Sequence, residues 1–465
     1  MSFRVQNTLT RTLEEFVPLE SGHARLYTCG PTVYNYAHIG NYRAYVFEDL
    51  LRRWLQFKGF QVTQVMNLTD VDDKTIRDSQ KKGQSLDDFT APFKTAFFDD
   101  IRTLNIEPAE HYPAATDHIQ EMIALIEILL EKGVAYRSEE GSIYFSIDKW
   151  PAYGKLARLD REGMRSGVRV ASDEYDKENV ADFALWKAWD EKDGEVVWDS
   201  PFGRGRPGWH IECSAMSQKY LGPSFDIHTG GVDNIFPHHE DEIAQSEAAN
   251  GQPLATYWLH CAHLMVDGHK MSKSQGTFYT LRDVLERGYS GREVRYELLA
   301  THYRASLNFT FSSLDAARTS LRRIDEFTTR VKEAAGTVPA GLLPGWAHDT
   351  AERFEAAMDE DLNISGALAA LFDAIREGNA AMDSHTLDAA EASAMVELFQ
   401  RWDGALGVLE KPVESIPAEV QSRVDRRQEA RAAKDWAQSD ALRDEMAALG
   451  WLVKDTPNGQ VITKA

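Results

Sequence analysis

An apolar strand, an amphipathic helix and a second apolar strand follow one another directly near the start of the chain. Residues 24–29 and 60–68 are the two strand segments, rich in apolar or β-branched side chains. Between them, residues 41–58 place apolar side chains at every fourth position, which gives a helix one buried face. One such row consists of Val46, Leu50 and Trp54. Because a strand–helix–strand unit joins strands that run the same way, this order predicts an α/β fold with a parallel sheet.

The chain has 465 residues, enough for several domains. We expect a first domain over residues 1–290, in which Thr69-Asp70 cap the helix after the second strand. The charged helical stretch and hairpin pattern of residues 85–182 predict an insertion. After the insertion, we expect the alternating pattern to resume near Phe183.

Strand patterns end near residue 291, and helical periodicity predicts a bundle over residues 291–410. A proline-containing stretch, residues 410–417, follows it. The last segment, residues 418–465, predicts a small appendage of helices followed by a hairpin that turns at Pro457-Asn458-Gly459.

The charge of the chain limits the partners that it can bind. Lys and Arg number 51 against 73 Asp and Glu, which gives a formal net charge of −22. Such a field repels a polyanion, so a nucleic acid would have to be bound by a local patch. Residues 418–465 hold equal numbers of basic and acidic side chains and are a candidate patch. A solvated helix face explains the same pattern.

The first residues are polar, and no stretch of the sequence is long and apolar enough to span a membrane. We therefore expect a soluble, cytoplasmic protein with no membrane partner. Three cysteines, Cys29, Cys213 and Cys261, are too few and too scattered for a disulfide framework. Their thiols are free to bind metal, although Cys261 fits an ordinary buried position.

Two short motifs predict phosphate binding. The first is His38-Ile39-Gly40-Asn41, where the first helix begins. Unpaired N–H groups at a helix N-terminus attract phosphate, and glycine allows close approach to the backbone, although a loop histidine is more often structural. The second is the loop Lys270-Met271-Ser272-Lys273-Ser274. Its flexible ammonium groups suit pyrophosphate, and a plain solvated loop is the alternative.

Four side chains of metal-binding type lie on or next to predicted elements. Cys29 ends a strand and Cys213 lies in a helix. His238 and Glu242 are four residues apart on a helix opened by Pro237, so both project from one face. Thiolate, imidazole and carboxylate ligands suit zinc. From spacing alone, three neighbours compete as ligands, and these are His239, Glu240 and Asp241.

The two phosphate motifs together resemble the signature pair of the class I aminoacyl-tRNA synthetases. Within that class, further stretches are similar to the cysteinyl-tRNA synthetases. These stretches are residues 27–34, 67–74, 208–216, 236–244 and 434–443, so the resemblance extends over nearly the whole chain. One position departs from the family pattern, because Asn41 stands where histidine is common. Asparagine donates a hydrogen bond but carries no charge.

This resemblance implies a Rossmann-like catalytic domain, a helical bundle and an anticodon-binding appendage. It implies a ligase that forms cysteinyl adenylate from L-cysteine and ATP with Mg²⁺, and then transfers cysteine to the 3′-terminal adenosine of tRNA(Cys). It also implies one Zn²⁺ per chain, which binds a thiolate but leaves the hydroxyl of serine protonated and poorly bound. We further expect a monomer.

The resemblance assigns residues to four roles. The catalytic residues are His38, Asn41, Lys270 and Lys273. The nucleotide would be bound by His38, Gly40, Asn41, Gly230, Gly231, Asp233 and Lys273. Cysteine would be bound by Cys29, Thr69, Trp209 and Asp233, with the role of Asp233 open between ribose and substrate ammonium. The metal ligands are Cys29, Cys213, His238 and Glu242, and candidates for the anticodon are Trp436 and Arg427.

Three other functions share parts of this pattern. A related ligase could pass activated cysteine to a small-molecule amine, but its relatives generally have a reduced anticodon region. A zinc-dependent hydrolase would use the same Cys, His and Glu residues, yet it leaves the loop with Lys270 and Lys273 unexplained. A non-catalytic tRNA-binding protein would tolerate the loss of Lys273.

Overall fold

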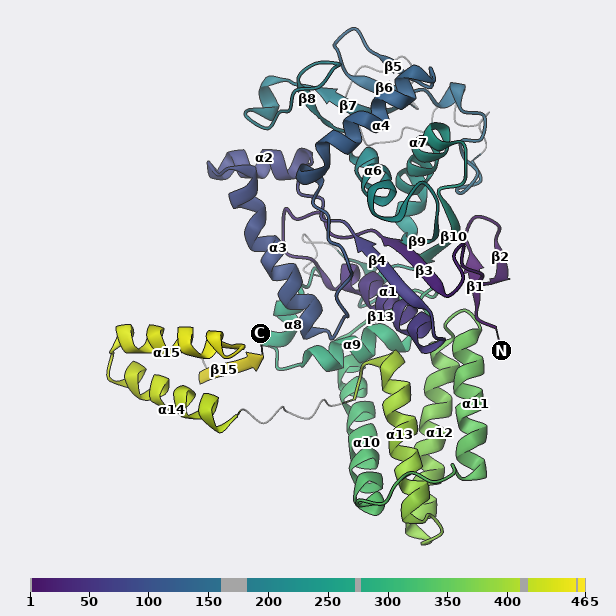
Figure 1. Ribbon diagram of the computed structural model, residues 1–465, viewed down its shortest axis with the longest axis vertical. Coiled ribbons are helices and arrows are strands. Elements are labelled where there is room, and N and C mark those ends of the chain that lie inside the picture. The colour runs from purple at the N-terminus through teal and green to yellow at the C-terminus, as the bar shows by residue number, and fades with distance from the viewer. Residues whose placement is uncertain (1, 160–181, 272–276, 410–416, 457–458, 465) are drawn as a thin grey trace. The chain divides into compact units, whose positions relative to one another are not determined.

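The computed structural model describes residues 2–159, 182–271, 277–409, 417–456 and 459–464 (Figure 1). The chain divides into two compact units, residues 1–409 and 410–465. Each unit has its own hydrophobic core.

A four-stranded parallel sheet lies at the centre of the first unit (Figure 1). Its strands are, in spatial order, β10 (Ala255–Cys261), β9 (Phe225–Gly231), β3 (His23–Thr28) and β4 (Gln61–Met66). Helix α1 (Ile39–Phe57) connects β3 to β4, and its apolar row is fully buried. The predicted strand, helix and strand are therefore confirmed. A short hairpin of β1 (Arg4–Asn7) and β2 (Thr12–Glu15) precedes the sheet.

The predicted cap at Thr69-Asp70 is wrong. Helix α2 (Asp73–Lys82) begins after Asp72, whose side chain accepts a hydrogen bond from the Thr75 backbone. Asp70 is buried instead and forms an ion pair with Lys94 at 2.7 Å. A run of acidic residues offers several possible caps, and packing of the neighbouring segment decides among them.

A second sheet, antiparallel, lies between β4 and β9 in the sequence. It contains β5 (Ala135–Arg137), β6 (Ile143–Phe145), β7 (Phe183–Ala188) and β8 (Gly205–Pro207). Helices of the same region are α2, α3 (Leu86–Thr103), the short η1 (Ala115–His118) and α4 (Ile119–Glu131). The pattern therefore does not resume at Phe183, because β7 pairs with β6 and β8. A short apolar strand buried on both faces looks alike in either kind of sheet. The alternation resumes with α6 (Trp209–Leu221).

A helical bundle follows the central sheet in the sequence (Figure 1). Its helices are α10 (Phe311–Ala335), α11 (Gly345–Asp359), α12 (Ile364–Asp383) and α13 (Ala389–Leu406), preceded by α8 (Leu281–Glu286) and α9 (Gly291–Ala300). The expectation of no strand within residues 291–410 is wrong, because β13 (Leu307–Phe309) pairs with β11 (Leu264–Val266). One hydrophobic core extends from α1 into the bundle, so the predicted division at residues 290 and 291 remains a prediction.

The second unit consists of two helices and a hairpin, as the sequence predicts. They are α14 (Ala418–Ala432), α15 (Trp436–Ala448), β14 (Trp451–Thr456) and β15 (Gly459–Lys464). The predicted turn residues Pro457 and Asn458 lie outside the described residues. Among the helices that the structure describes, none has the length and apolar character needed to span a membrane.

Candidate active site

Most of the predicted site residues lie at the carboxyl edge of the parallel sheet. Cys29 directly follows β3, and Gly230 and Gly231 end β9. Thr69 follows β4 by three residues. In open α/β sheets this edge is where ligands bind, because loops from several strands meet there.

The four predicted metal ligands come together at this edge. One ligand atom from each of Cys29, Cys213, His238 and Glu242 lies within 4.8 Å of the other three. Helix α6 carries Cys213, and α7 (Glu240–Asn250) carries Glu242. His238 belongs to the preceding turn η5 (Ile235–His239), which is π-helical rather than the start of one regular helix. Its Nε2 still lies 3.1 Å from Oε1 of Glu242, as projection from one face requires.

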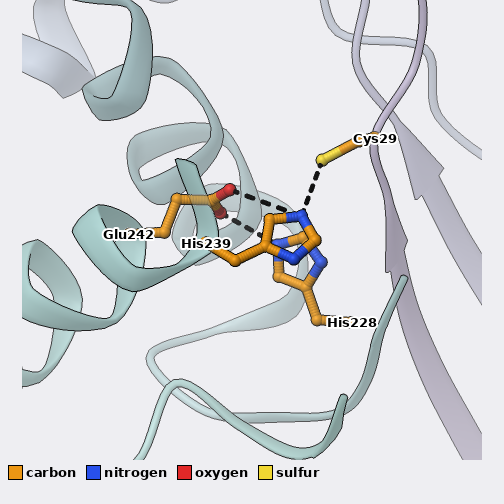
Figure 2. A group of neighbouring side chains, drawn as sticks. All are labelled: Cys29, His228, His239 and Glu242. Atoms are coloured by element: carbon orange, nitrogen blue, oxygen red, sulfur yellow. Dashed lines mark hydrogen bonds and ion pairs between the residues drawn. The ribbon is translucent and has the colours of Figure 1, made fainter. Parts of the chain in front are cut away.

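A second set of four side chains has the same compactness and shares Cys29 and Glu242 with the first. Figure 2 shows this set, in which His228 and His239 replace Cys213 and His238. Nε2 of His239 lies 3.3 Å from the Cys29 sulfur, and Nε2 of His228 lies 2.9 Å from Oε2 of Glu242. The sequence left His239 open as a ligand but missed His228, whose distance along the chain from Glu242 matches no ligand repeat.

The other two competing carboxylates are engaged elsewhere. Glu240 accepts hydrogen bonds from the backbone of Gly154 and Leu156. Asp241 accepts one from the Tyr153 hydroxyl at 2.5 Å. Neither carboxylate belongs to a compact ligand group within the described part of the chain.

The electrostatics of the first set suit a cation. Oε1 of Glu242 is buried and accepts no hydrogen bond from any described residue, although Nε2 of His238 is close. Burial lowers the pKa of His238 to about 3, so its imidazole is neutral, as a metal ligand must be. A hydrogen bond with Cys29 and burial raise the pKa of the Cys213 thiol well above its usual value. A bound cation would favour the thiolate instead. The donor set therefore fits Zn²⁺.

Two further histidines orient the cluster. Nδ1 of His210 lies 2.8 Å from Nδ1 of His238, and Nε2 of His210 lies 3.3 Å from Asp241. Nδ1 of His239 lies 2.8 Å from Nε2 of His260. Such outer contacts hold imidazole rings in position for a metal. The ring of Trp209, which is 44% exposed, lies 4.4 Å from that of His238.

The first phosphate motif forms the N-terminus of α1. His38 is the N-cap residue, and its Nδ1 accepts a hydrogen bond from the Asn41 backbone at 3.2 Å. The Asn41 side-chain oxygen accepts one from the His38 backbone at 3.0 Å. The amide thus completes a capping box at the position where the family often has histidine.

The second motif begins at the last residue of β12 (His269–Lys270), and the segment after the motif contacts the start of α1. Ile39 donates a backbone hydrogen bond to Tyr279 at 2.9 Å. A Cβ atom on Gly40 would lie 2.4 Å from the terminal methyl of Met271, so glycine permits the close contact. Lys270 is exposed, whereas Lys273 lies outside the described residues. The structure therefore places the beginning of the second motif against the first.

The remaining predicted residues have different environments. A Cβ atom on Gly230 would lie 2.8 Å from the His239 ring, and one on Gly231 would lie 2.4 Å from the Asp233 carboxylate. Asp233 is exposed. Thr69 is only 1% exposed, and its hydroxyl donates a hydrogen bond to Glu212 at 3.0 Å. The sequence did not single out Glu212, because a helix position next to Cys213 carries no pattern of its own.

In the second unit, the two predicted anticodon residues differ. Trp436 is 57% exposed, and the guanidinium of Arg431 lies over its ring. Arg427 is 1% exposed and donates a hydrogen bond to Gln460. The side chain of Arg427 belongs to the interior of the unit, and its role as an anticodon residue stays a prediction.

Comparison with known families agrees with this arrangement. Residues 15–319 match the family model for the tRNA synthetases class I (C) catalytic domain. Residues 353–410 match a DALR domain, and residues 414–462 match a cysteinyl-tRNA ligase anticodon binding domain. The parallel sheet and the match over residues 15–319 therefore define a class I aminoacyl-tRNA synthetase.

Individual relatives show which family within this class the chain belongs to. The cysteine–tRNA ligase of Protochlamydia amoebophila is 52% identical, with 99% of this chain and 98% of that protein covered. The cysteine–tRNA ligase of Chlamydia felis is 50% identical over 98% and 97% of the two chains. The chain belongs to the cysteine–tRNA ligase family.

Solved structures share the fold at much lower identity. A Mycobacterium tuberculosis methionyl-tRNA synthetase in complex with methionyl-adenylate has a TM-score of 0.61 at 15% identity, covering 82% of this chain and 90% of that one. An Agrobacterium radiobacter LeuRS in a ternary complex has a TM-score of 0.62 at 12% identity, covering 84% and 85%. The predicted α/β fold is confirmed.

Proposed function

We propose that this protein attaches cysteine to tRNA(Cys) in two steps at the carboxyl edge of the sheet. The observation that carries the proposal is the meeting of Cys29, Cys213, His238 and Glu242 beside a helix N-terminus, in a chain of this family. In the first step, the carboxylate of L-cysteine attacks the α-phosphate of ATP. A carboxyl oxygen–phosphorus bond forms, the bond to the β-phosphate oxygen breaks, and pyrophosphate leaves with Mg²⁺.

The residues of the two motifs stabilise this first step. The N-terminus of α1 and the amide of Asn41 would hold the α-phosphate, with His38 beside them. Gly40, Gly230 and Gly231 would admit the nucleotide close to the backbone, and Asp233 would contact ribose or substrate. Lys270 and Lys273 would follow the charge of pyrophosphate. No protein nucleophile is needed.

We infer that Cys29, Cys213, His238 and Glu242 hold one Zn²⁺ per chain, rather than the set with His228 and His239. Two sulfurs suit zinc better than one. His228 already engages Oε2 of Glu242, which leaves Oε1 for the metal. Zinc bound here would supply selection of a thiolate over the hydroxyl of serine. Trp209 and Thr69 would line the cysteine pocket.

In the second step, the terminal ribose hydroxyl of the tRNA attacks the carbonyl of cysteinyl adenylate, and AMP leaves. The class I architecture supports the 2′-hydroxyl. Residues 1–290 would form the catalytic domain with its insertion at about 85–182, and residues 291–410 the bundle. Residues 418–465 would bind the anticodon, with exposed Trp436 as a stacking surface. We expect a monomer that acts in the cytoplasm.

The competing functions account for less of the chain. The match to an anticodon binding domain and the near-complete coverage of the relatives do not support a ligase with a small-molecule acceptor. A hydrolase would leave the capped helix and the lysine loop without a role.

The test is charging of bulk tRNA with labelled cysteine, run beside cysteine-dependent ATP–pyrophosphate exchange, with and without zinc removal. Charging with exchange supports the proposal, and loss of both after zinc removal supports thiolate selection. Exchange without charging would contradict the tRNA step. Absence of both charging and exchange in the zinc-loaded protein would contradict the whole proposal.

A further inference from the structure

A network of hydrogen bonds connects the segment that carries Cys29 with the segment that carries Cys213. The Gly30 backbone donates to the side-chain oxygen of Asn67 at 2.9 Å, and the Asn67 amide donates to the Thr69 hydroxyl at 3.0 Å. That hydroxyl donates to Oε2 of Glu212 at 3.0 Å. This hydrogen-bond network thus begins one residue after Cys29, at Gly30, and ends one residue before Cys213, at Glu212. It therefore connects the two segments that carry the cysteines.

Glu212 ends this hydrogen-bond network, and the charge of Arg206 acts on its carboxyl group without a described ion pair between them. Its side chain is 1% exposed, and its Oε1 accepts no hydrogen bond from any residue that the structure describes. Two other buried acids of this unit do have cations, since Asp49 pairs with Arg295 at 2.5 Å and Asp70 pairs with Lys94. Within the described ranges, no Lys, Arg or His lies within ion-pair distance of Glu212. A buried carboxyl oxygen without a hydrogen bond is costly, and a bound ligand can supply the missing donor.

L-Cysteine carries a group of the required kind. Its α-ammonium is separated from the thiol sulfur by only two carbon atoms, so a thiol held near Cys29 and Cys213 brings the ammonium close to their neighbours. The ammonium offers three N–H donors. Oε1 of Glu212 lacks a donor, and the Thr69 hydroxyl has room for a further hydrogen bond.

We propose that Glu212, oriented by Thr69, holds the α-ammonium of L-cysteine and makes the site specific for an amino thiol. This inference rests on the proposed function, because it concerns how the same site binds its amino acid. It predicts that a thiol acid without the amino group gains nothing from Glu212.

The test compares two ligands on the zinc-loaded, full-length protein by calorimetric titration. The ligands are L-cysteine and 3-mercaptopropionate, which lacks only the amino group. Glu212→Gln should raise the Kd of L-cysteine by about tenfold or more and leave that of 3-mercaptopropionate unchanged, since a charged hydrogen bond is worth about 1.5–3 kcal/mol. Thr69→Val should also raise the ratio of the Kd of L-cysteine to the Kd of 3-mercaptopropionate. This second variant provides the test if Glu212→Gln fails to fold.

Glu48→Gln is the matched control. Glu48 is also a buried glutamate with one unpaired oxygen, and it accepts a hydrogen bond from the Thr229 hydroxyl at 2.8 Å. This variant should leave the ratio of the two Kd values unchanged. Equal weakening of both ligands by Glu212→Gln, or no weakening, would overturn the inference. A changed ratio in Asp233→Asn but not in Glu212→Gln would place the ammonium at Asp233 instead.

The wild-type protein separates this inference from the proposed function. If it shows no cysteine-dependent exchange, the proposed function fails. If exchange is normal and Glu212→Gln leaves the ratio unchanged, only the role of Glu212 fails.

Discussion

His38 and Asn41 cap each other at the first turn of α1. Each side chain accepts a hydrogen bond from the backbone N–H of the other, at 3.2 Å and 3.0 Å. Because the oxygen of the Asn41 amide is used in this way, the NH₂ group is the part of the amide that can donate to a phosphate. The same residue therefore contributes to helix stability and is the residue that we propose to hold the α-phosphate.

Replacement of Asn41 should separate these two contributions. Asn41→Asp keeps an acceptor for the His38 backbone but replaces the donor with a negative charge. We expect stability near that of the wild type and at least tenfold slower ATP–pyrophosphate exchange. Asn41→Ala should lose both, with about 1 kcal/mol of stability. Exchange kinetics and denaturant unfolding measure the two effects, and normal exchange in Asn41→Asp would contradict the assigned role.

Cys213→Ser should lower zinc content and raise the KM for cysteine far more than the KM for ATP. Cys261→Ser is the control, because Cys261 is equally buried but lies outside both metal-binding groups. Metal analysis and exchange kinetics with each substrate varied would measure the difference. Similar losses for cysteine and ATP in Cys213→Ser would indicate a metal that only supports the fold.

Zinc binding to the metal-free protein should release protons in proportion to the number of thiols that bind. The pKa values of Cys29 and Cys213 are both raised, so both thiols are protonated near neutral pH, and a metal binds only the thiolate. The ligand set with both cysteines predicts two protons released, whereas the set with His228 and His239 predicts one. Titration in buffers of different ionisation enthalpy counts them. Affinity should rise with pH in either case.

Glu48 should make stability depend on pH. Burial raises its pKa from 4.5 to about 8, against a hydrogen bond from Thr229 that lowers it. Between these values the folded chain keeps a proton that the unfolded chain has released. The free energy of unfolding should therefore fall with rising pH, by about 1.4 kcal/mol per pH unit for this one group. Glu48→Gln should remove that slope, as denaturant unfolding at pH 5 and pH 8 would detect.

Trp436 and Arg427, the two candidate anticodon residues of the second unit, should respond differently to substitution by alanine. Trp436→Ala should lower kcat/KM for tRNA and leave exchange unchanged, because its ring is exposed and is expected to stack on bases. Arg427→Ala should instead destabilise the second unit, since it removes a buried side chain and its hydrogen bond to Gln460. A tRNA defect in Trp436→Ala accompanied by unfolding would contradict the distinction. Circular dichroism with charging assays separates these outcomes.

The regular elements of the fold were largely predictable from local pattern. The buried row of α1 and the strands on either side have periods that differ clearly, so β3, α1 and β4 follow from the sequence. The strand at Phe183 was placed in the wrong sheet, because burial on both faces hides which partner a strand takes. The three residues of β13 are too few to show any period.

The candidate site depended on information that local pattern does not contain. His238 and Glu242 could be paired from their spacing, but only the family resemblance connected them with Cys29 and Cys213. His228 and Glu212 were missed because their neighbours come from other strands and helices. A contact of this kind is set by packing of distant segments, and one sequence carries no direct record of it.

The candidate metal ligands are far apart in the sequence, from Cys29 directly after β3 to Glu242 on α7. This separation has a consequence for how the protein matures. Cys29 emerges early in synthesis, whereas Glu242 follows only after the whole insertion has been made. No short nascent segment contains all four candidate ligands, so the proposed zinc site would form only after β3 and β9 have paired and α6 and α7 have packed beside them. Metal acquisition would then report completed folding of the catalytic unit, and a truncated nascent chain would remain metal-free.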